Sequence, residues 1–105
     1  MTQIVFLQSG DSLVGFDISG HSGAGIAGED VVCAAISSAA YLAANTITDI
    51  CRVAADASVE DGRMVVRVAE KDAARCQDIL KGLHLHMEQL EQQYPHHIQV
   101  TNLEV

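Results

Sequence analysis

The stretch that decides the fold is residues 30–48, which read DVVCAAISSAAYLAANTIT. Asp30 is a favoured helix N-cap residue, and no glycine, proline or further charge follows it within the stretch. Apolar residues recur on every side of the predicted helix, so we expect it to be buried on more than one side. A sheet can cover one side, and a second helix or another subunit must cover the rest.

A hairpin precedes this helix. Residues 2–8 are rich in Ile, Val, Phe and Leu, and residues 12–19 alternate, with Val14, Phe16 and Ile18 on one face. The residues between these runs, Ser-Gly-Asp at 9–11, are typical of a turn. The pattern predicts two antiparallel strands.

A second hairpin follows the helix. Residues 51–59 alternate, with Val53, Ala55, Ala57 and Val59 on one face, and Asp61-Gly62 is a strong two-residue hairpin signal. Met64, Val66 and Val68 then mark the return strand over the next residues.

A long amphipathic helix is predicted over residues 72–94, and Pro95 ends it. Its apolar seam has spacings of three and four, at Cys76, Leu80, Leu83, Met87, Leu90 and Tyr94. Ile98 and Val100 predict a last strand at an edge of the sheet. The order ββα-ββα-β indicates an α+β fold: a mostly antiparallel five-stranded sheet with two helices on one face. We expect residues 1–105 to form a single domain.

The charge balance restricts the partners. Fourteen acidic residues against six Lys and Arg give a net charge of −8, which disfavours direct nucleic-acid binding and favours a basic peptide. The charge-free run at residues 31–48 contains Ser, Asn and Thr, so we expect no membrane span. Three cysteines, an odd number, and no basic leader indicate a cytoplasmic protein with reduced thiols.

Residues 20–28 contain four glycines, Gly20, Gly23, Gly25 and Gly28. We expect a mobile loop that gates access of the substrate. Residues 23–28 also match the dinucleotide-binding pattern G-x-G-x-x-G. That assignment fails, because a hairpin precedes the loop where a parallel βαβ unit is required, and acids stand where a pyrophosphate would lie.

Cys33 and His21 form the candidate catalytic pair. With Asp30 as N-cap, Cys33 falls in the first helical turn, where the helix dipole and unpaired amides favour a thiolate and provide an oxyanion hole. If the glycine-rich loop turns back onto its helix, His21 reaches the sulfur and acts as general base. Asp30 and Ser37 are the candidates for an orienting or supporting group, although Asp30 is equally explained as a cap.

These residues also resemble a known family. Its signature is matched by a dense block, Gly20-His21 followed by Gly28-x-Asp30-x-Val32-Cys33-Ala34-Ala35-x-Ser37. The block is similar to that of the ribosomal-processing cysteine proteases, the Prp family, and the order of elements fits over nearly the whole chain.

The resemblance implies a function and a partner. Members remove an N-terminal extension from a large-subunit ribosomal protein, form homodimers, and use a Cys-His pair that corresponds to Cys33 and His21. The extension is basic and carries paired phenylalanines, which suits an acidic enzyme. The alternative is a non-catalytic dimeric adaptor that binds a ribosomal protein or an assembly factor.

No cofactor or metal ion is expected. His84 and His86 are two residues apart on a helix and point away from each other, and His96 and His97 face opposite ways in an extended segment. We expect His84 to pair with Glu88 instead. Cys51 and Cys76 lie on predicted apolar faces, where packing accounts for them.

Overall fold

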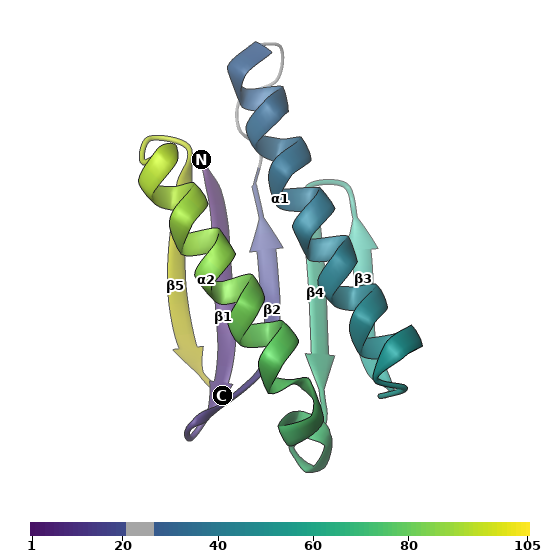
Figure 1. Cartoon of the computed structure of the whole chain (residues 1–105). Helices are drawn as coiled ribbons and strands as arrows, with labels where there is room; N and C mark the ends of the chain where they lie inside the picture. Colours follow the sequence, from purple (N-terminus) through teal and green to yellow (C-terminus); the bar gives the residue numbers. More distant parts are fainter. Residues whose placement is uncertain (21–26) are drawn as a thin grey trace.

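The computed structural model describes residues 1–20 and 27–105, with the side chains of residues 27–30 left aside. Its helices and strands follow the predicted order (Figure 1). They are β1 (Thr2–Ser9), β2 (Ser12–Ser19), α1 (Ala27–Asn45), β3 (Ala55–Glu60), β4 (Arg63–Val68), α2 (Gln77–Gln93) and β5 (Ile98–Glu104). A π-helical turn, Thr46–Ile50, extends α1, and a 3₁₀ segment, Glu70–Cys76, leads into α2.

The five strands form one sheet in the order β3-β4-β2-β1-β5. The pairings β1–β2, β2–β4 and β3–β4 are antiparallel, whereas β5 runs parallel to β1. The predicted α+β fold is therefore confirmed, and β5 lies at an edge as expected. The sheet is mixed because α2 crosses over from β4 and returns the chain in the direction of β1.

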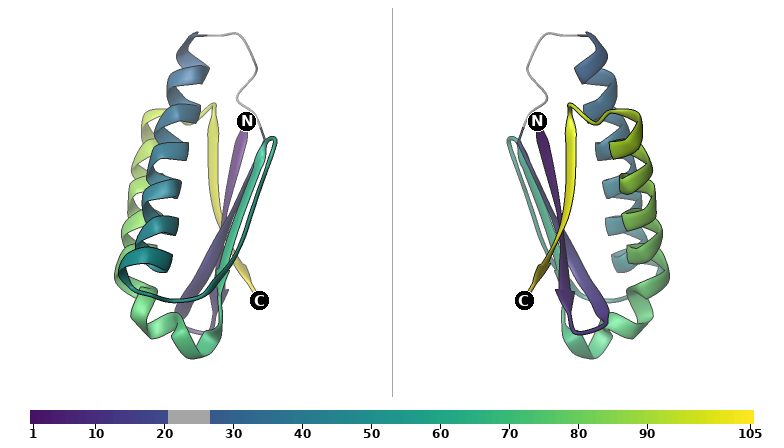
Figure 2. Two further views of the ribbon diagram at one scale, coloured as in Figure 1. Left: turned by 90° about the vertical axis from the view of Figure 1, so that its right-hand side faces the viewer. Right: turned by 90° about the vertical axis from the view of Figure 1, so that its left-hand side faces the viewer.

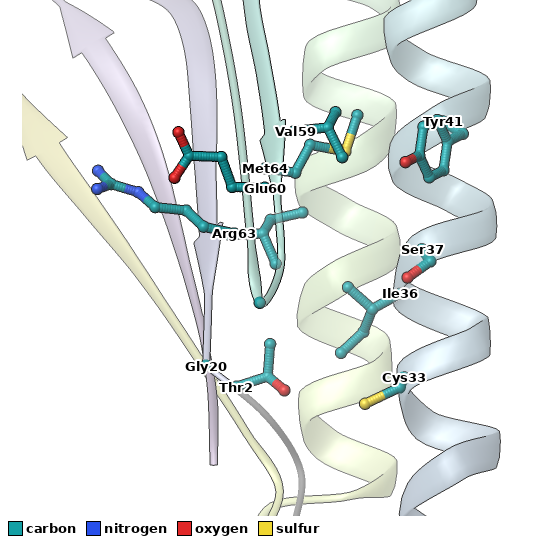
Figure 3. A pocket seen from close by; sticks show the side chains of 12 residues that line it. Thr2, Gly20, Cys33, Ile36, Ser37, Tyr41, Val59, Glu60, Arg63 and Met64 are labelled. Atoms are coloured by element: carbon teal, nitrogen blue, oxygen red, sulfur yellow. The ribbon is translucent and has the colours of Figure 1, made fainter.

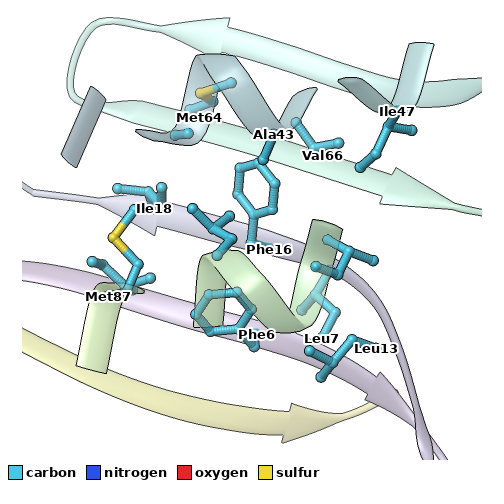
Figure 4. Close-up of a cluster of buried hydrophobic side chains, with 14 of the residues drawn as sticks. Phe6, Leu7, Leu13, Phe16, Ile18, Ala43, Ile47, Met64, Val66 and Met87 are labelled. Atoms are coloured by element: carbon cyan, nitrogen blue, oxygen red, sulfur yellow. The ribbon is translucent and has the colours of Figure 1, made fainter. Parts of the chain in front are cut away.

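Two layers make up the molecule. Both helices lie on the same face of the sheet (Figure 2), and the apolar core fills the space between the layers (Figure 4). The predicted apolar seam is confirmed, with Leu80 and Met87 of α2 and Cys76, the last residue of the 3₁₀ segment, completely buried. The regular helix begins at Gln77, later than the predicted residue 72. On the sheet, Phe6 and Phe16 pack with their ring centroids 6.5 Å apart.

Helix α1 begins four residues earlier than predicted, at Ala27 instead of Val31. The sequence placed Asp30 at the N-cap, but Ala27 already has helical backbone, so Asp30 falls within the first turn. Ala27 and Glu29 are good helix formers, and acidic residues suit the first turn of a helix because of its dipole. Cys33 is consequently in the second turn and not, as predicted, in the first.

Strand β3 begins later than predicted. The π-helical turn and the residues after it occupy positions 46–54, and Arg52 adopts a left-handed backbone with φ of 59°. Val53 is buried, but Ala57 and Val59 are exposed, so the apolar face of this edge strand is only partly covered.

One side of α1 is covered and the other is not. The inward side chains of α1 are buried, and so is one in the π-helical turn that follows it. They are Val32, Ile36, Ala40 and Ala43 in α1, and Ile47 in the turn. Val31 and Leu42, on other sides, are 61% and 66% exposed. By length and composition alone the segment Val31–Ile50 is apolar enough to cross a membrane, a test that core helices also pass. The expectation that no membrane is involved stays a prediction.

Candidate functional site

Cys33 lies on the side of α1 that faces the end of the sheet. Its side chain is half-buried and lines a pocket of about 230 Å³ between the helix and the strands. In Figure 3 the sulfur extends from α1 toward the sheet. The thiol is therefore accessible to a ligand of limited size and held on a regular helix.

The pocket draws its walls from four parts of the chain. The helix contributes Cys33, Ile36, Ser37 and Tyr41; the start of β1 contributes Thr2; the end of β2 contributes Ile18 and Gly20; and the β3–β4 hairpin contributes Val59, Glu60, Gly62, Arg63 and Met64. Most of these side chains are apolar. The pocket therefore suits an apolar group with a few polar contacts around it.

Ser37 lies one helical turn after Cys33, as predicted. It is exposed and lines the same pocket, and its hydroxyl is drawn on the side of α1 that faces the sheet (Figure 3). Asp30 precedes Cys33 by three residues and lies in the first turn of α1. Its side chain is outside the part of the chain that the structure describes. The geometry brings Ser37 to the candidate nucleophile and leaves the role of Asp30 a prediction.

Gly20 fixes the backbone at the edge of the pocket. Its φ is +95°, and a Cβ atom there would lie 2.7 Å from the carbonyl oxygen of Met1. Its amide donates a hydrogen bond of 3.0 Å to the carbonyl of Gly62. Only glycine fits this conformation and this close approach, so the chain leaves β2 at a defined point beside the pocket.

The residues that follow Gly20 include the predicted general base and the predicted gating loop. His21, Gly23 and Gly25 lie outside the described residues, and so does the predicted mobility of their loop. Gly28 was predicted to belong to that loop but has helical backbone in α1. This residue is helical because α1 starts at Ala27, one turn ahead of the expected position.

The position of Cys33 changes the expected source of its activation. The effect of a helix dipole falls off within the first turn, and amides beyond it are occupied by bonds within the helix. Cys33 stands in the second turn, so first-turn amides do not surround it as predicted.

The charged residues of the pocket are Glu60 and Arg63. Arg63 donates two hydrogen bonds to the Asp17 carboxylate, of 2.8 Å and 3.1 Å. The hydrogen bond to Asp17 raises the pKa of the Arg63 guanidinium above its ordinary value, so it stays charged at any working pH. In Figure 3 the charged ends of Glu60 and Arg63 point to the face of the sheet away from the helices, so the side of the pocket near Cys33 is lined by neutral side chains among the described residues.

Thr2 is a pocket residue that the sequence did not indicate. It is 3% exposed, and its hydroxyl has no hydrogen-bond partner among the residues that the structure describes. Leaving a buried hydroxyl unpaired costs about 1–3 kcal/mol. No local motif marks Thr2, because only the folding of β1 beside β2 brings it opposite α1.

The other predicted cysteines and histidines lie elsewhere. Cys76 is completely buried, and this burial, with Cys51 as a smaller cause, raises the pKa of its thiol. His84 pairs with Glu88 as expected, with Nδ1 3.0 Å from Oε1, and its Nε2 lies 2.9 Å from Oδ1 of Asn102. These contacts, and the packing of its ring on Phe6, give His84 a structural role.

A two-layer α+β domain with a cysteine in a pocket fits a small thiol-dependent enzyme. The family model for the cysteine protease Prp matches residues 1–99, and the chain belongs to this family. No curated protein matches the chain.

Solved structures share the fold. The Streptococcus mutans protein SMU.848 is 19% identical with a TM-score of 0.90, covering 100% of this chain and 99% of its own. The Staphylococcus aureus ribosomal processing protease Prp has been solved with a substrate peptide, at 20% identity and a TM-score of 0.87. It has also been solved with a covalently linked product peptide, at 21% identity and a TM-score of 0.86. Both Prp structures cover 98% of this chain and 100% of their own.

Proposed function

We propose that this protein is a cytoplasmic endopeptidase that removes a basic N-terminal extension from a large-subunit ribosomal protein, with Cys33 as nucleophile and His21 as general base. The observation that carries the proposal is the half-buried Cys33 on the wall of the pocket beside Gly20. The family membership supports protease chemistry, and the S. aureus relative is a ribosomal processing protease.

The bonds made and broken in the proposed reaction involve this pair and water. As the proton of Cys33 passes to His21, Sγ bonds to the scissile carbonyl carbon. The C–N bond then breaks, and His21 returns the proton to the leaving amine. Water then attacks the carbonyl carbon of the thioester while one of its protons passes to His21. The C–S bond breaks, the acid is released, and His21 returns the proton to Sγ, which restores the thiol.

The position of Cys33 in α1 bears on the roles that we propose for its neighbours. Cys33 is in the second turn of α1, where the helix terminus contributes little to its activation, and this supports a separate general base such as His21. Ser37 lies one turn from Cys33 and supports the pair or the bound peptide. Asp30, in the first turn of α1, is our candidate for the group that orients His21.

Charge favours a basic substrate. The net charge of the chain is −8. A basic extension is attracted to such a surface, and the apolar pocket walls then receive an aromatic or aliphatic side chain.

The test is cleavage of a basic peptide with two adjacent phenylalanines, followed by mass spectrometry. Cys33→Ala and His21→Ala should each lower the rate by more than about 100-fold, because the two side chains act as a unit. The matched controls are Cys51→Ala, at another half-buried cysteine, and His96→Ala, at an exposed histidine. Both should retain the wild-type rate.

Two results would contradict the proposal. Substantial cleavage by Cys33→Ala would mean that another residue is the nucleophile. A wild-type protein that binds the peptide and leaves it intact would indicate a non-catalytic adaptor.

A further inference from the structure

The inference starts from the inward-facing positions of β1. Thr2, Ile4 and Phe6 alternate toward the helices, and all three are buried, at 3%, 0% and 0% exposed. Two of them are core residues, as an alternating strand requires. The third is a hydroxyl at the point where the core ends and the pocket of Cys33 begins.

The hydroxyl of Thr2 is available. Its Oγ1 atom is buried without a hydrogen-bond partner in the described parts of the chain, residues 1–20 and 27–105. The backbone of Thr2 is satisfied, since its amide donates to the carbonyl of His97 at 2.8 Å. A valine of nearly the same shape would fill this position without burying an unpaired polar atom. Packing alone does not account for the threonine.

The Thr2 side chain shares the pocket with Cys33. In Figure 3 the sulfur of Cys33 extends from the helix, and the hydroxyl of Thr2 is drawn from the sheet toward the helix side. Both residues line the same pocket. A group that enters between them to reach the sulfur passes the hydroxyl. Rotation about the Cα–Cβ bond of Thr2 exchanges its methyl and hydroxyl groups between staggered positions and presents the oxygen to that group.

We propose that Thr2 is a substrate-binding residue whose hydroxyl hydrogen-bonds to the main chain of the peptide next to Cys33. A peptide backbone offers both carbonyl oxygens and amide hydrogens, and a hydroxyl can donate or accept. A charged partner is disfavoured, because a neutral hydroxyl does not compensate a buried charge. This inference rests on the proposed function, since it takes a peptide as the ligand.

The experiment compares Thr2→Val, Thr2→Ser and wild type. Valine removes the hydroxyl and keeps the shape, whereas serine keeps the hydroxyl. For the basic peptide with two adjacent phenylalanines, Thr2→Val should lower kcat/KM about tenfold, equivalent to about 1.4 kcal/mol, mainly by raising KM. Thr2→Ser should restore most of it. Thr101→Val, at an exposed threonine of β5, is the matched control and should leave kcat/KM unchanged.

Two further measurements separate binding from structure. The midpoint of urea unfolding of Thr2→Val should equal or exceed that of wild type, because an unpaired buried hydroxyl is replaced by a methyl group. The rate at which iodoacetamide alkylates Cys33 should not change, since Thr2 acts on the peptide and not on the sulfur.

The outcomes distinguish this inference from the proposed function. A lower unfolding midpoint for Thr2→Val would show that the hydroxyl has a partner within the chain and would overturn the inference. An unchanged kcat/KM would also overturn it, while leaving the protease intact. If wild type does not cleave, calorimetry with the inactive Cys33→Ala protein decides. About tenfold weaker peptide binding on adding Thr2→Val supports the inference, and equal or absent binding overturns it.

Discussion

The three cysteines lie in surroundings that give their thiols different reactivities. Burial raises the pKa of Cys76, so at neutral pH its thiol is protonated and shielded from solvent. Cys33 and Cys51 are both half-buried, but only Cys33 lines the pocket beside Gly20. Because the thiolate is the reactive species, the site of alkylation reports on the local environment.

We expect iodoacetamide at neutral pH to modify Cys33 fastest, Cys51 more slowly and Cys76 only after unfolding in urea, as mapped by peptide mass spectrometry. His21→Ala should slow the reaction of Cys33 and leave that of Cys51 unchanged. Modification of Cys76 in the folded protein at a rate equal to that of Cys33 would contradict the expected order of alkylation, in which Cys33 reacts before Cys51 and Cys51 before Cys76.

The raised pKa of Cys76 also predicts that the stability of the protein depends on pH. In the unfolded chain the Cys76 thiol ionises from about pH 8.5, whereas in the folded protein it stays protonated to higher pH. The contribution of this thiol to the free energy of unfolding is therefore complete below about pH 8.5 and declines as the pH rises further.

The residues of the site differ in how well they could be predicted from the sequence. Ser37 was placed beside Cys33 correctly, because a spacing of four on a helix is a local property. Thr2 and Arg63 were missed, because the sheet brings them to the pocket from distant parts of the chain. Asp30 shows a third case: an acid near a helix start suits both the cap and the first turn, and local pattern does not separate the two.

At the scale of elements, the sheet contains a glycine that strand pairing requires. Gly15 lies in β2 between β1 and β4, and a Cβ atom there would be 2.1 Å from the carbonyl oxygen of Val66. The backbones of β2 and β4 therefore approach more closely than a side chain allows. Gly82 in α2 has nothing within 4 Å of the corresponding position and provides the control.

We expect Gly15→Ala to lower the free energy of unfolding by about 1–3 kcal/mol, because backbone must move to admit the methyl group. Gly82→Ala should raise it by about 0.5–1 kcal/mol, because alanine is the better helix former. Urea denaturation followed by circular dichroism gives both values. Equal stability of the two variants would show that β2 and β4 are not held at the distance described here.

The elements themselves were largely predictable. The two hairpins were identified from alternation and turn residues, which act over a few positions, and the seam of α2 from its spacing. The parallel pairing of β5 with β1 joins residues 98–104 to residues 2–8, and no local signal specifies it. The start of α1 was missed because an acid such as Asp30 suits both an N-cap and a first turn, and helix boundaries vary by one or two residues. No local signal indicated the π-helical turn that follows α1.

At the scale of the whole molecule, the outer side of the helical layer is unusually apolar. A groove of about 640 Å³ runs between α1 and α2. Its lining includes Ala35, Ala39, Leu42, Ile79, Leu83 and Leu90. The sequence predicted that a second helix or another subunit must cover the rest of α1, and with α2 in place Leu42 is still 66% exposed. An apolar surface of this kind on a protein of 105 residues is typical of an interface.

We therefore expect the protein to form a two-fold dimer at micromolar concentration, with the groove between α1 and α2 in its interface. Leu42→Gln places a polar amide in that interface and should weaken dimerisation by at least about tenfold, measured by sedimentation equilibrium. Leu103→Gln is the matched control: Leu103 is 53% exposed on β5 and does not line the groove, so the dimer should persist. The two substitutions have the same chemistry and similar exposure, so a difference between them locates the interface. A monomeric wild-type protein would refute the dimer, and an equal effect of both substitutions would place the interface away from the helical groove.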